Sequence, residues 1–321
     1  MTINLFAGTA GMSVWFSDDL GESWSRPYSE SGLYLEARVW ALSCHPDTPK
    51  RLYAGTDDGV YVCDVPGKRW QRVESPMNGM SVWALAQAPS NPDVIVAGTQ
   101  PAALFRSDDG GASWRKLPCE FATECIYVRL PRVTQVLFDP ADENRLWVGV
   151  EIDGVHVSED GGETWERRNE GLKSEDIHGL AIVEVPERAV YATSNKGLHR
   201  STDEGRSWQF LPLDSPWQYT RMIVPSPAND GTVYLGNGNG PPGDAGRLLV
   251  SHDGGKSWQG MSLPAELNST AWCIAASPRD PKLLFLATNL GQLFRSTDGG
   301  ANWDKLKREL GEIRALAWQS A

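Results

Sequence analysis

The chain has 321 residues, 40% of them hydrophobic, which is ordinary for a globular protein. Its 30 basic and 41 acidic residues give a formal charge of −11 without basic runs, which excludes nucleic acid and anionic membranes as expected partners. No apolar stretch approaches the roughly 18 residues of a membrane span, and no basic segment leads into an apolar one near the first residue, so we expect a cytoplasmic protein. The five cysteines, among which Cys119 and Cys125 form the closest pair, show no metal-binding spacing. The sequence therefore predicts reduced thiols and no metal site, and it indicates no particular cofactor.

Predicted strands recur in groups along the chain. The first strand, "NLFAGT" (4–9), has no inner strand before it, whereas the next group begins with "WALSCHP" (40–46) and continues with "RLYAGT" (51–56) and "GVYVC" (59–63). β-Branched and aromatic residues alternate in these segments, and glycine-rich breaks separate them, as is typical of strands. Similar groups follow, and we expect structural units at 3–26 with 313–319, 35–73, 80–118, 132–168, 177–212, 219–262 and 270–307.

A glycine-rich turn follows the third predicted strand of each group. In the copy "SDDGGASW" the third residue is aspartate, as in five other copies, and all seven copies have glycine at the fifth position and tryptophan at the eighth. The aspartate can accept hydrogen bonds from backbone N–H groups, and glycine reaches positive φ at little steric cost. The tryptophan is a large apolar residue that can pack between units, and we expect it on the fourth strand. The second copy, "CDVPGKRW", has Val65 in place of the aspartate. The copies start 43 to 51 residues apart and are Ser17–Trp24, Cys63–Trp70, Ser107–Trp114, Ser158–Trp165, Ser201–Trp208, Ser251–Trp258 and Ser296–Trp303.

This period indicates the architecture. A repeat of about 40–50 residues fits one four-stranded propeller blade. The chain begins with a second strand and finishes with "EIRALAWQ" (312–319), which reads as an inner strand. Pairing the two would close the ring and protect its edges. We therefore predict an all-β fold, a single seven-bladed β-propeller over 1–321, whose four-stranded antiparallel blades are closed by pairing the C-terminal inner strand with the N-terminal blade.

The repeated turn resembles the Asp-box, or BNR, repeat of sialidases, xyloglucan-degrading glycosidases, sortilin-type receptors and a photosystem II assembly factor. The likeness covers nearly the whole chain. It implies that the turns are structural and lie on the face away from the ligand. It also implies that ligands bind where the central channel opens on the opposite face.

Aligned inner strands predict which side chains meet at that opening. Arginine forks bind carboxylate or phosphate and tryptophans offer flat surfaces, so the set predicts a pocket for an anionic or saccharide ligand. The alternative is that the arginines pair with acids such as Glu36, Glu312 and Asp176 and plug the channel, although such pairing would not also require solvent-facing tryptophans. The candidate ligand-binding residues are Arg38, Trp40, Trp83, Arg132, Arg221, Trp272 and Arg314, beside Thr134 and His178.

Four residues are candidates for catalysis. His178 together with Glu151 or Asp153 could form an oriented base, and Tyr219 could move a proton. A buried, hydrogen-bonded His178 without a catalytic role is the alternative. His156 is interpreted as a packing residue, because sister blades carry aromatic residues at its position.

The sequence favours a small-ligand-binding propeller, an enzyme of the hydrolase or lyase type that acts on an anionic or sugar-like substrate. A glycosidase-like hydrolase is one form of this hypothesis. The chain nevertheless departs from sialidases, which have six blades, and from the xyloglucan enzymes, which have two propellers. The alternative is a non-catalytic propeller that binds or assembles proteins. Fold alone does not decide between them.

Overall fold

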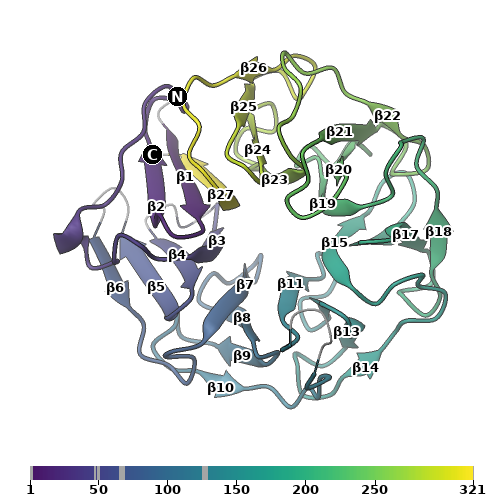
Figure 1. Cartoon of the computed structure of the whole chain (residues 1–321). Helices are drawn as coiled ribbons and strands as arrows, with labels where there is room; N and C mark the ends of the chain where they lie inside the picture. Colours follow the sequence, from purple (N-terminus) through teal and green to yellow (C-terminus); the bar gives the residue numbers. More distant parts are fainter. Residues whose placement is uncertain (1–2, 47, 49–50, 65–68, 125–128, 321) are drawn as a thin grey trace.

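The computed structural model describes residues 3–46, 48, 51–64, 69–124 and 129–320. Seven antiparallel sheets stand around a central axis (Figure 1), and in six of them strand neighbours follow the chain order. The predicted seven-bladed propeller is therefore confirmed. None of the helical segments in the described residues reaches the length or hydropathy that crossing a membrane requires.

The second strands carry much of the core. Their apolar residues are almost completely buried, because each sheet packs face to face with the sheets beside it, whereas the inner strands have several apolar residues that are only partly buried. The inner strands are β3 (Val39–Cys44), β7 (Ser81–Gln87), β11 (Val133–Phe138), β15 (Ile177–Val183), β19 (Thr220–Pro225), β23 (Ala271–Ala275) and β27 (Ile313–Ser320). The second strands are β1 (Ile3–Thr9), β4 (Arg51–Thr56), β8 (Ile95–Gln100), β12 (Leu146–Val150), β16 (Ala189–Ser194), β20 (Val233–Gly238) and β24 (Leu284–Thr288).

The outer half of each blade is shorter. The third strands are β2 (Val14–Ser17), β5 (Gly59–Asp64), β9 (Leu104–Ser107), β13 (Gly154–Ser158), β17 (Gly197–Ser201), β21 (Gly246–Ser251) and β25 (Leu293–Ser296). The fourth strands are β6 (Arg69–Arg72), β10 (Arg115–Lys116), β14 (Glu166–Arg167), β18 (Gln209–Leu211), β22 (Gln259–Gly260) and β26 (Asp304–Lys305). In the first blade the fourth strand is reduced to a bridge between Phe16 and Ser25, which precedes the short 3-10 helix η1 (Ser29–Ser31).

The ring closes as the sequence predicts. Strand β27 lies beside β1 in Figure 1, and the pairing runs from Ile3 opposite Ser320 to Thr9 opposite Ile313. Because both partners are otherwise edge strands, this pairing leaves neither inner edge open.

The repeated turns share one hydrogen-bond pattern. In the third copy, Ser107 Oγ donates to Asp109 Oδ1 (2.8 Å), and the N–H groups of Ser113 and Gly111 donate to Asp109 Oδ1 and Ser107 Oγ (2.8 Å each). Gly111 has φ +88°, a conformation that disfavours any side chain. Hydrogen bonds from Ser113 and Ser107 lower the pKa of Asp109 to about 2. Val65 of the degenerate second copy lies outside the described residues.

The tryptophans of these turns join neighbouring blades. Trp208 belongs to the same core cluster as Trp147 of the preceding blade, and Trp24 to the same cluster as Phe285 of the last blade. Strand β10 begins one residue after Trp114, so the prediction that places the tryptophan on the fourth strand is wrong there. Trp114 lies in the turn instead, where its Nε1 donates to the carbonyl oxygen of Gly111 (3.0 Å), whereas Trp70 lies within β6 as predicted.

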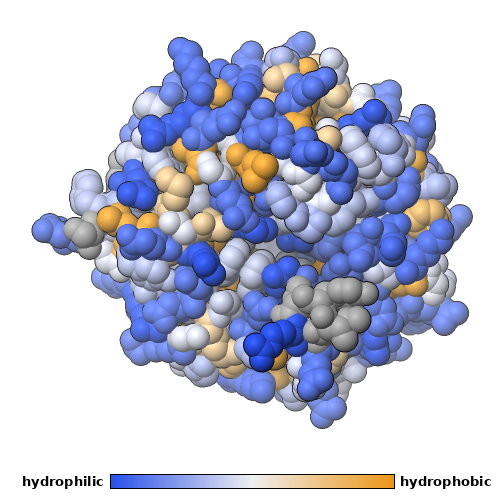
Figure 2. All heavy atoms as spheres, in the orientation of Figure 1, coloured by the Kyte–Doolittle hydropathy of each residue, from blue (hydrophilic) through white to orange (hydrophobic). Residues whose placement is uncertain are grey.

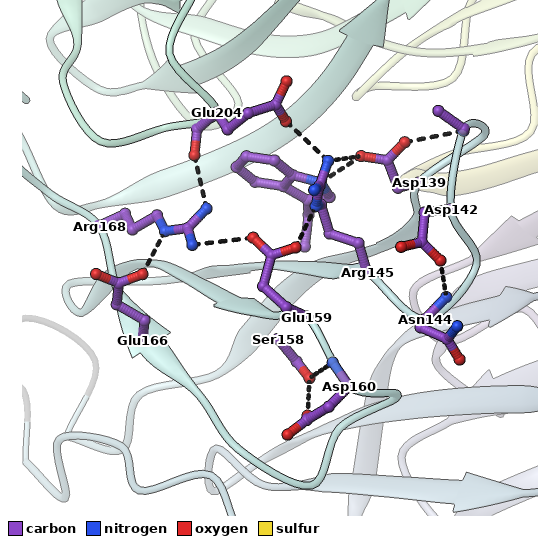
Figure 3. A network of polar contacts seen from close by, with 12 residues as sticks. Asp139, Asp142, Asn144, Arg145, Ser158, Glu159, Asp160, Glu166, Arg168 and Glu204 are labelled. Carbon is purple, nitrogen blue, oxygen red and sulfur yellow. Dashed lines mark hydrogen bonds and ion pairs between the residues drawn. The ribbon is translucent and has the colours of Figure 1, made fainter.

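An ion-pair network also links the fourth and fifth blades beside their turns (Figure 3). Arg145 contacts Glu159 (2.6 Å) of its own blade and Glu204 (3.1 Å) of the next, while Arg168 Nη2 lies 3.0 Å from Glu159. The carboxylate of Asp139, which has no solvent exposure, lies at the inner end of this network.

Candidate functional site at the centre of the ring

Each inner strand carries a β-bulge near its N-terminal end. In β15, Ile177 pairs with Ser194 and Gly179 with Thr193, so His178 is left without a partner in β16. A bulge bends the strand and re-aims the extra side chain. Seven of the nine residues that sequence reasoning placed at the opening are left unpaired by the bulges, whereas Arg38 and Arg132 directly precede their strands. The seven are Trp40, Trp83, Thr134, His178, Arg221, Trp272 and Arg314.

These seven bulge residues line one cavity of about 280 Å³ on the axis of the ring. Figure 2 shows the molecule hollowed at the centre of this face, with mostly hydrophilic side chains around the hollow. The seven bulges therefore place one side chain from every blade around a common space.

Two tryptophans stack beside this cavity. The rings of Trp40 and Trp83 lie 4.0 Å apart and are tilted by only 10°. The guanidinium of Arg132 covers the Trp83 ring at 3.9 Å, and that of Arg314 lies 5.6 Å from the Trp40 ring. Each of the two tryptophan rings thus contacts the other ring and one guanidinium group. The contacts with the guanidinium groups are favourable cation–π interactions.

The third tryptophan extends the stack. Arg314 also lies 4.9 Å from the ring of Trp272, and Arg221 lies 4.1 Å from the same ring. Trp272 is only 5% exposed. The expectation of solvent-facing tryptophans is therefore wrong for Trp272, because the arginines take up its faces. We call these six residues the arginine–tryptophan ladder; in order they are Arg132, Trp83, Trp40, Arg314, Trp272 and Arg221.

The ladder concentrates positive charge. Burial and the charges of Arg221 and Arg132 lower the pKa of Arg314 to about 10. Arg132 is paired with Glu151 (Nη2 to Oε1, 2.8 Å), and Arg314 is paired with Glu312. Arg221 forms no ion pair with any residue that the structure describes. The alternative in which protein acids neutralise the arginines thus holds for two of the four, Arg132 and Arg314. Neither the guanidinium of Arg221 nor that of Arg38 has an acidic partner among the described residues.

His178 is held from both sides. Its Nδ1 lies 2.7 Å from the carbonyl oxygen of Thr220, and its Nε2 lies 3.3 Å from Asp176 Oδ2. A carbonyl oxygen only accepts, so Nδ1 carries hydrogen and donates. The ring of Tyr219 lies 4.9 Å from the imidazole. Burial raises the pKa of Tyr219, an effect that the charge of Arg221 opposes.

Two carboxylates at this site have opposite pKa shifts. Burial raises the pKa of Glu151, and the charge of Arg132 only partly offsets that rise. Burial also acts on Asp176, but the hydrogen bond and charge of His178 and the charges of the arginines outweigh it and lower the pKa. The negative charge of Asp176 adds to the rise at Glu151. Such a divided pair is the pattern of an acid and a base in one site.

Several polar atoms of this site have no hydrogen-bond partner among the described residues. They are buried, and an unpaired buried polar atom costs free energy unless a ligand or water satisfies it. They are Trp40 Nε1, Trp83 Nε1, Arg132 Nε, Arg314 Nε, Glu151 Oε2, Asp176 Oδ1 and Tyr219 Oη.

Two expectations need correction. Arg38 is exposed and does not line the cavity; its backbone is fixed by Asp57. Arg132 and Tyr219 do not line it either, but they lie against Trp83 and His178, which do, and Glu151 is paired with Arg132. The expected pairing of His178 with Glu151 or Asp153 is wrong, since His178 pairs with Asp176. Asp153 contacts His156 (3.2 Å) instead. The reason is the turn between β12 and β13, which reverses the chain after Glu151, so that Asp153 faces the outer part of the blade.

Comparison with known proteins agrees with the fold. No protein-family model matches the chain. The chain is 23% identical over 322 aligned residues to an oligoxyloglucan-reducing end-specific xyloglucanase from Emericella nidulans. That alignment covers 83% of this chain and 40% of the enzyme. The solved GH74 xyloglucanase from Xanthomonas campestris superimposes with a TM-score of 0.65 and 21% identity over 84% of this chain and 45% of that one. The structure of YCF48 bound to D1 peptide gives a TM-score of 0.59 and 15% identity over 84% of this chain and 81% of that one.

The chain is thus a seven-bladed β-propeller that is similar in sequence to xyloglucanases and shares its fold with the solved GH74 xyloglucanase and YCF48 structures. It spans about 40% of the length of the first xyloglucanase that it matches. Among the described residues, no group of three or more His, Cys, Asp or Glu side chains is arranged to hold a metal ion.

Proposed function

We propose that the protein is a sugar-acting hydrolase whose substrate carries an anionic group and binds where the central cavity opens on the face seen in Figure 2. The observation that carries this proposal is the unpaired Arg221 of the arginine–tryptophan ladder next to two carboxylates with opposite pKa shifts. The xyloglucanase names of the relatives support a sugar as the substrate class.

In this proposal the arginine–tryptophan ladder binds the substrate. The tryptophan faces are taken up by one another and by guanidinium groups, so their role is to hold the arginines in fixed orientations. The guanidinium of Arg221 is the free anchor for a carboxylate, which it can bind through two parallel N–H bonds. The unpaired Nε1 groups of Trp40 and Trp83 are further donors for sugar hydroxyl groups. A uronic acid offers both kinds of acceptor.

In this proposal the carboxylates of Glu151 and Asp176 carry out hydrolysis. Glu151, with its raised pKa, is the acid that donates a proton to the glycosidic oxygen as the bond to the anomeric carbon breaks. Asp176, with its lowered pKa, is the ionised partner that stabilises or attacks the anomeric carbon, and water completes the reaction. His178 keeps Asp176 ionised and oriented, and Tyr219 lies beside them. Asp153 takes no part in this scheme.

The repeated turns have a different role in this proposal. We assign them to the Asp-box type and give them only the structural task of fixing the outer hairpins. Their aspartates already accept hydrogen bonds within the turn, as Asp109 does from Ser107 and Ser113. Their low pKa values leave no proton to donate at neutral pH.

The test combines binding and turnover. Thermal unfolding is followed with glucuronic-acid-bearing and neutral xylo-oligosaccharides, and release of reducing ends is measured with the same compounds. A ligand at a hundredfold excess over Kd stabilises the native state by about 2.7 kcal/mol. We expect a shift with the acidic compounds that Arg221→Gln removes and that Arg247→Gln keeps, because Arg247 lies over Trp217 at 5.7 Å outside the cavity.

The outcomes separate the parts of the proposal. Glu151→Gln and Asp176→Asn should bind the acidic compounds but lose turnover. Shifts with neutral compounds alone would overturn the anionic substrate, and no shift with any saccharide in a folded protein would overturn the hydrolase.

A protein-binding propeller is the second candidate. The observation that favours it is that Arg132 and Arg314 already have acidic partners, which leaves room for one carboxylate at Arg221. A peptide C-terminus would supply one. Binding of an acidic peptide that Arg221→Gln abolishes, without any saccharide turnover, would support this function.

A further inference from the structure

A second cavity lies in the fourth blade, away from the ring centre. It measures about 560 Å³ and is bordered by the end of β13, by β14 and by the connection that follows β10. We call it the thiol pocket; its lining residues used below are Cys119, Phe121, Asp153, His156, Trp165 and Arg167. The proposed sugar site uses none of them.

Three side chains of the thiol pocket form a relay. Cys119 Sγ lies 3.8 Å from His156 Nδ1, and His156 Nε2 lies 3.2 Å from Asp153 Oδ2. All three residues are more than nine-tenths buried. The histidine therefore stands between a thiol and a carboxylate, as the base does in nucleophile–base–carboxylate triads.

The relay is fixed from outside. Asp153 Oδ2 also accepts the N–H of Ala122 (2.9 Å), and Arg167 lies 3.4 Å from Asp153 Oδ1. The ring of Phe121 meets that of His156 edge-on at 4.9 Å. Because a carboxylate only accepts, Nε2 carries the imidazole hydrogen and Nδ1 is free to accept the thiol proton. Burial of the thiol and the charge of Asp153 raise the pKa of Cys119 to about 12, so the resting group is a thiol rather than a thiolate.

The other blades show that this arrangement is not needed for packing. The positions that match His156 in the third strands carry Trp15, Tyr61, Phe105 and Phe294 in four blades and Leu249 in the sixth. The fifth blade also has a histidine there, His199, but its Nε2 accepts the backbone N–H of Lys173, and no thiol or carboxylate of the described residues is paired with it. The fourth blade alone combines these three groups among the described residues.

We propose that Cys119, His156 and Asp153 form a second reactive centre that accepts acyl groups from small esters or thioesters. The Cys119 sulfur adds to the acyl carbonyl carbon while its proton passes to His156 Nδ1. The carbon–oxygen or carbon–sulfur bond to the leaving group then breaks, and the leaving group takes the proton from His156. Water attacks the resulting thioester, with His156 again accepting and returning a proton, and releases the carboxylic acid and the free thiol.

The walls of the pocket indicate the kind of acyl group. Phe121 and Trp165 provide aromatic surface, and the guanidinium of Arg167, about half exposed, borders the same space. Aromatic walls suit a flat or short apolar acyl group. A neighbouring guanidinium stabilises the oxygen that becomes negative when sulfur adds to the carbonyl.

The experiment follows acetylation by p-nitrophenyl acetate. Release of p-nitrophenolate is timed, and the acetylated residue is located by mass spectrometry after acid quenching. We expect a burst of one p-nitrophenolate per chain with the acetyl group on Cys119. The partly buried residues Cys44 and Cys273 serve as internal controls, since desolvation raises the pKa values of their thiols to about 12 as well and no histidine among the described residues is hydrogen-bonded to them.

Substitutions test the relay rather than the thiol alone. His156→Phe installs the residue type that the sister blades carry, so the fold is expected to persist, and it should lower the acetylation rate at least a hundredfold. Asp153→Asn should lower it about tenfold or more, and His199→Phe, the matched control, should leave it unchanged.

Two results would overturn the proposal: acetylation of Cys119 no faster than that of Cys44 and Cys273, or a rate unaffected by His156→Phe in a protein whose circular dichroism matches the wild type. Sugar turnover serves as a separate readout, because Cys119→Ser should not change it.

Discussion

Substitution of Asp139 by alanine tests whether the network in Figure 3 joins the fourth and fifth blades. Its carboxylate accepts hydrogen bonds from Ala141 N (2.9 Å) and Trp147 Nε1 (3.1 Å), and it is paired with Arg145 and Arg188. The variant leaves two donors unpaired, at about 1–3 kcal/mol each. The arginines keep other acidic partners, so the total destabilisation should be about 4 kcal/mol, within the range for breaking a buried pair.

The assay is urea and thermal unfolding. At roughly 2 °C per kcal/mol for a chain of this size, the melting temperature should fall by about 8 °C. Asp142→Ala is the matched control, because Asp142 lies in the same connection but is exposed and accepts only the N–H of Asn144 (3.0 Å). A loss below about 1 kcal/mol, or an equal loss in the control, would refute the reasoning.

The pH dependence gives a second readout for Asp139. Although burial opposes it, hydrogen bonds from Ala141, Trp147 and Arg188 lower the pKa of this carboxyl group. Its contribution is therefore complete above the unfolded-state pKa of about 3.9 and is lost as the pH falls through the lowered folded-state value. The stability difference between wild type and Asp139→Ala should shrink in that acidic range.

Further expected outcomes concern turnover, closure and the turns. Sugar hydrolysis should have an acidic optimum. Its rate should fall as the pH rises through the raised pKa of Glu151 and as the pH drops through the lowered pKa of Asp176. A pH–rate profile of Glu151→Gln that still shows the decline at higher pH would contradict this. Deleting 313–320 should abolish cooperative unfolding in calorimetry, and a peptide of that sequence should restore it if β27 only completes the blade. Gly205→Ala should lower the free energy of unfolding in urea by more than about 1 kcal/mol, because φ at Gly205 is +76° and the new Cβ would lie 2.8 Å from the ring of a buried tryptophan. In the control Gly299→Ala the new Cβ meets no neighbouring atom, so the loss should be smaller.

The repeat made the fold predictable. Seven copies of one turn at near-constant spacing define seven equivalent hairpins, and aligned inner strands then assign equivalent positions without further information. This is why residues as far apart as Trp40 and Arg314 were correctly expected around one space. The fourth strand of the first blade, reduced to a bridge at Ser25, followed from no comparable signal.

Side-chain pairing could not be predicted in the same way. An alignment gives the height of a residue along the axis but not the direction that a turn imposes, and so Asp153 was expected beside His178. The stacking of Trp40 on Trp83 depends on packing between two neighbouring blades, and the contact of Asp176 with His178 depends on the local path of the chain at the bulge of β15. One signal for the thiol pocket was present: His156 stands where the sister blades carry aromatic residues.

The pairing of β1 with β27 also bears on how the protein is made. A ribosome releases β1 before β27, so the first blade waits for its inner strand until the six other blades have been synthesised. During that time the edge of β1, whose residues are all apolar or small except Asn4 and Thr9, is open to other nascent chains. Synthesis rate and chaperone supply should therefore affect the yield of this protein more than the stability of any single blade does.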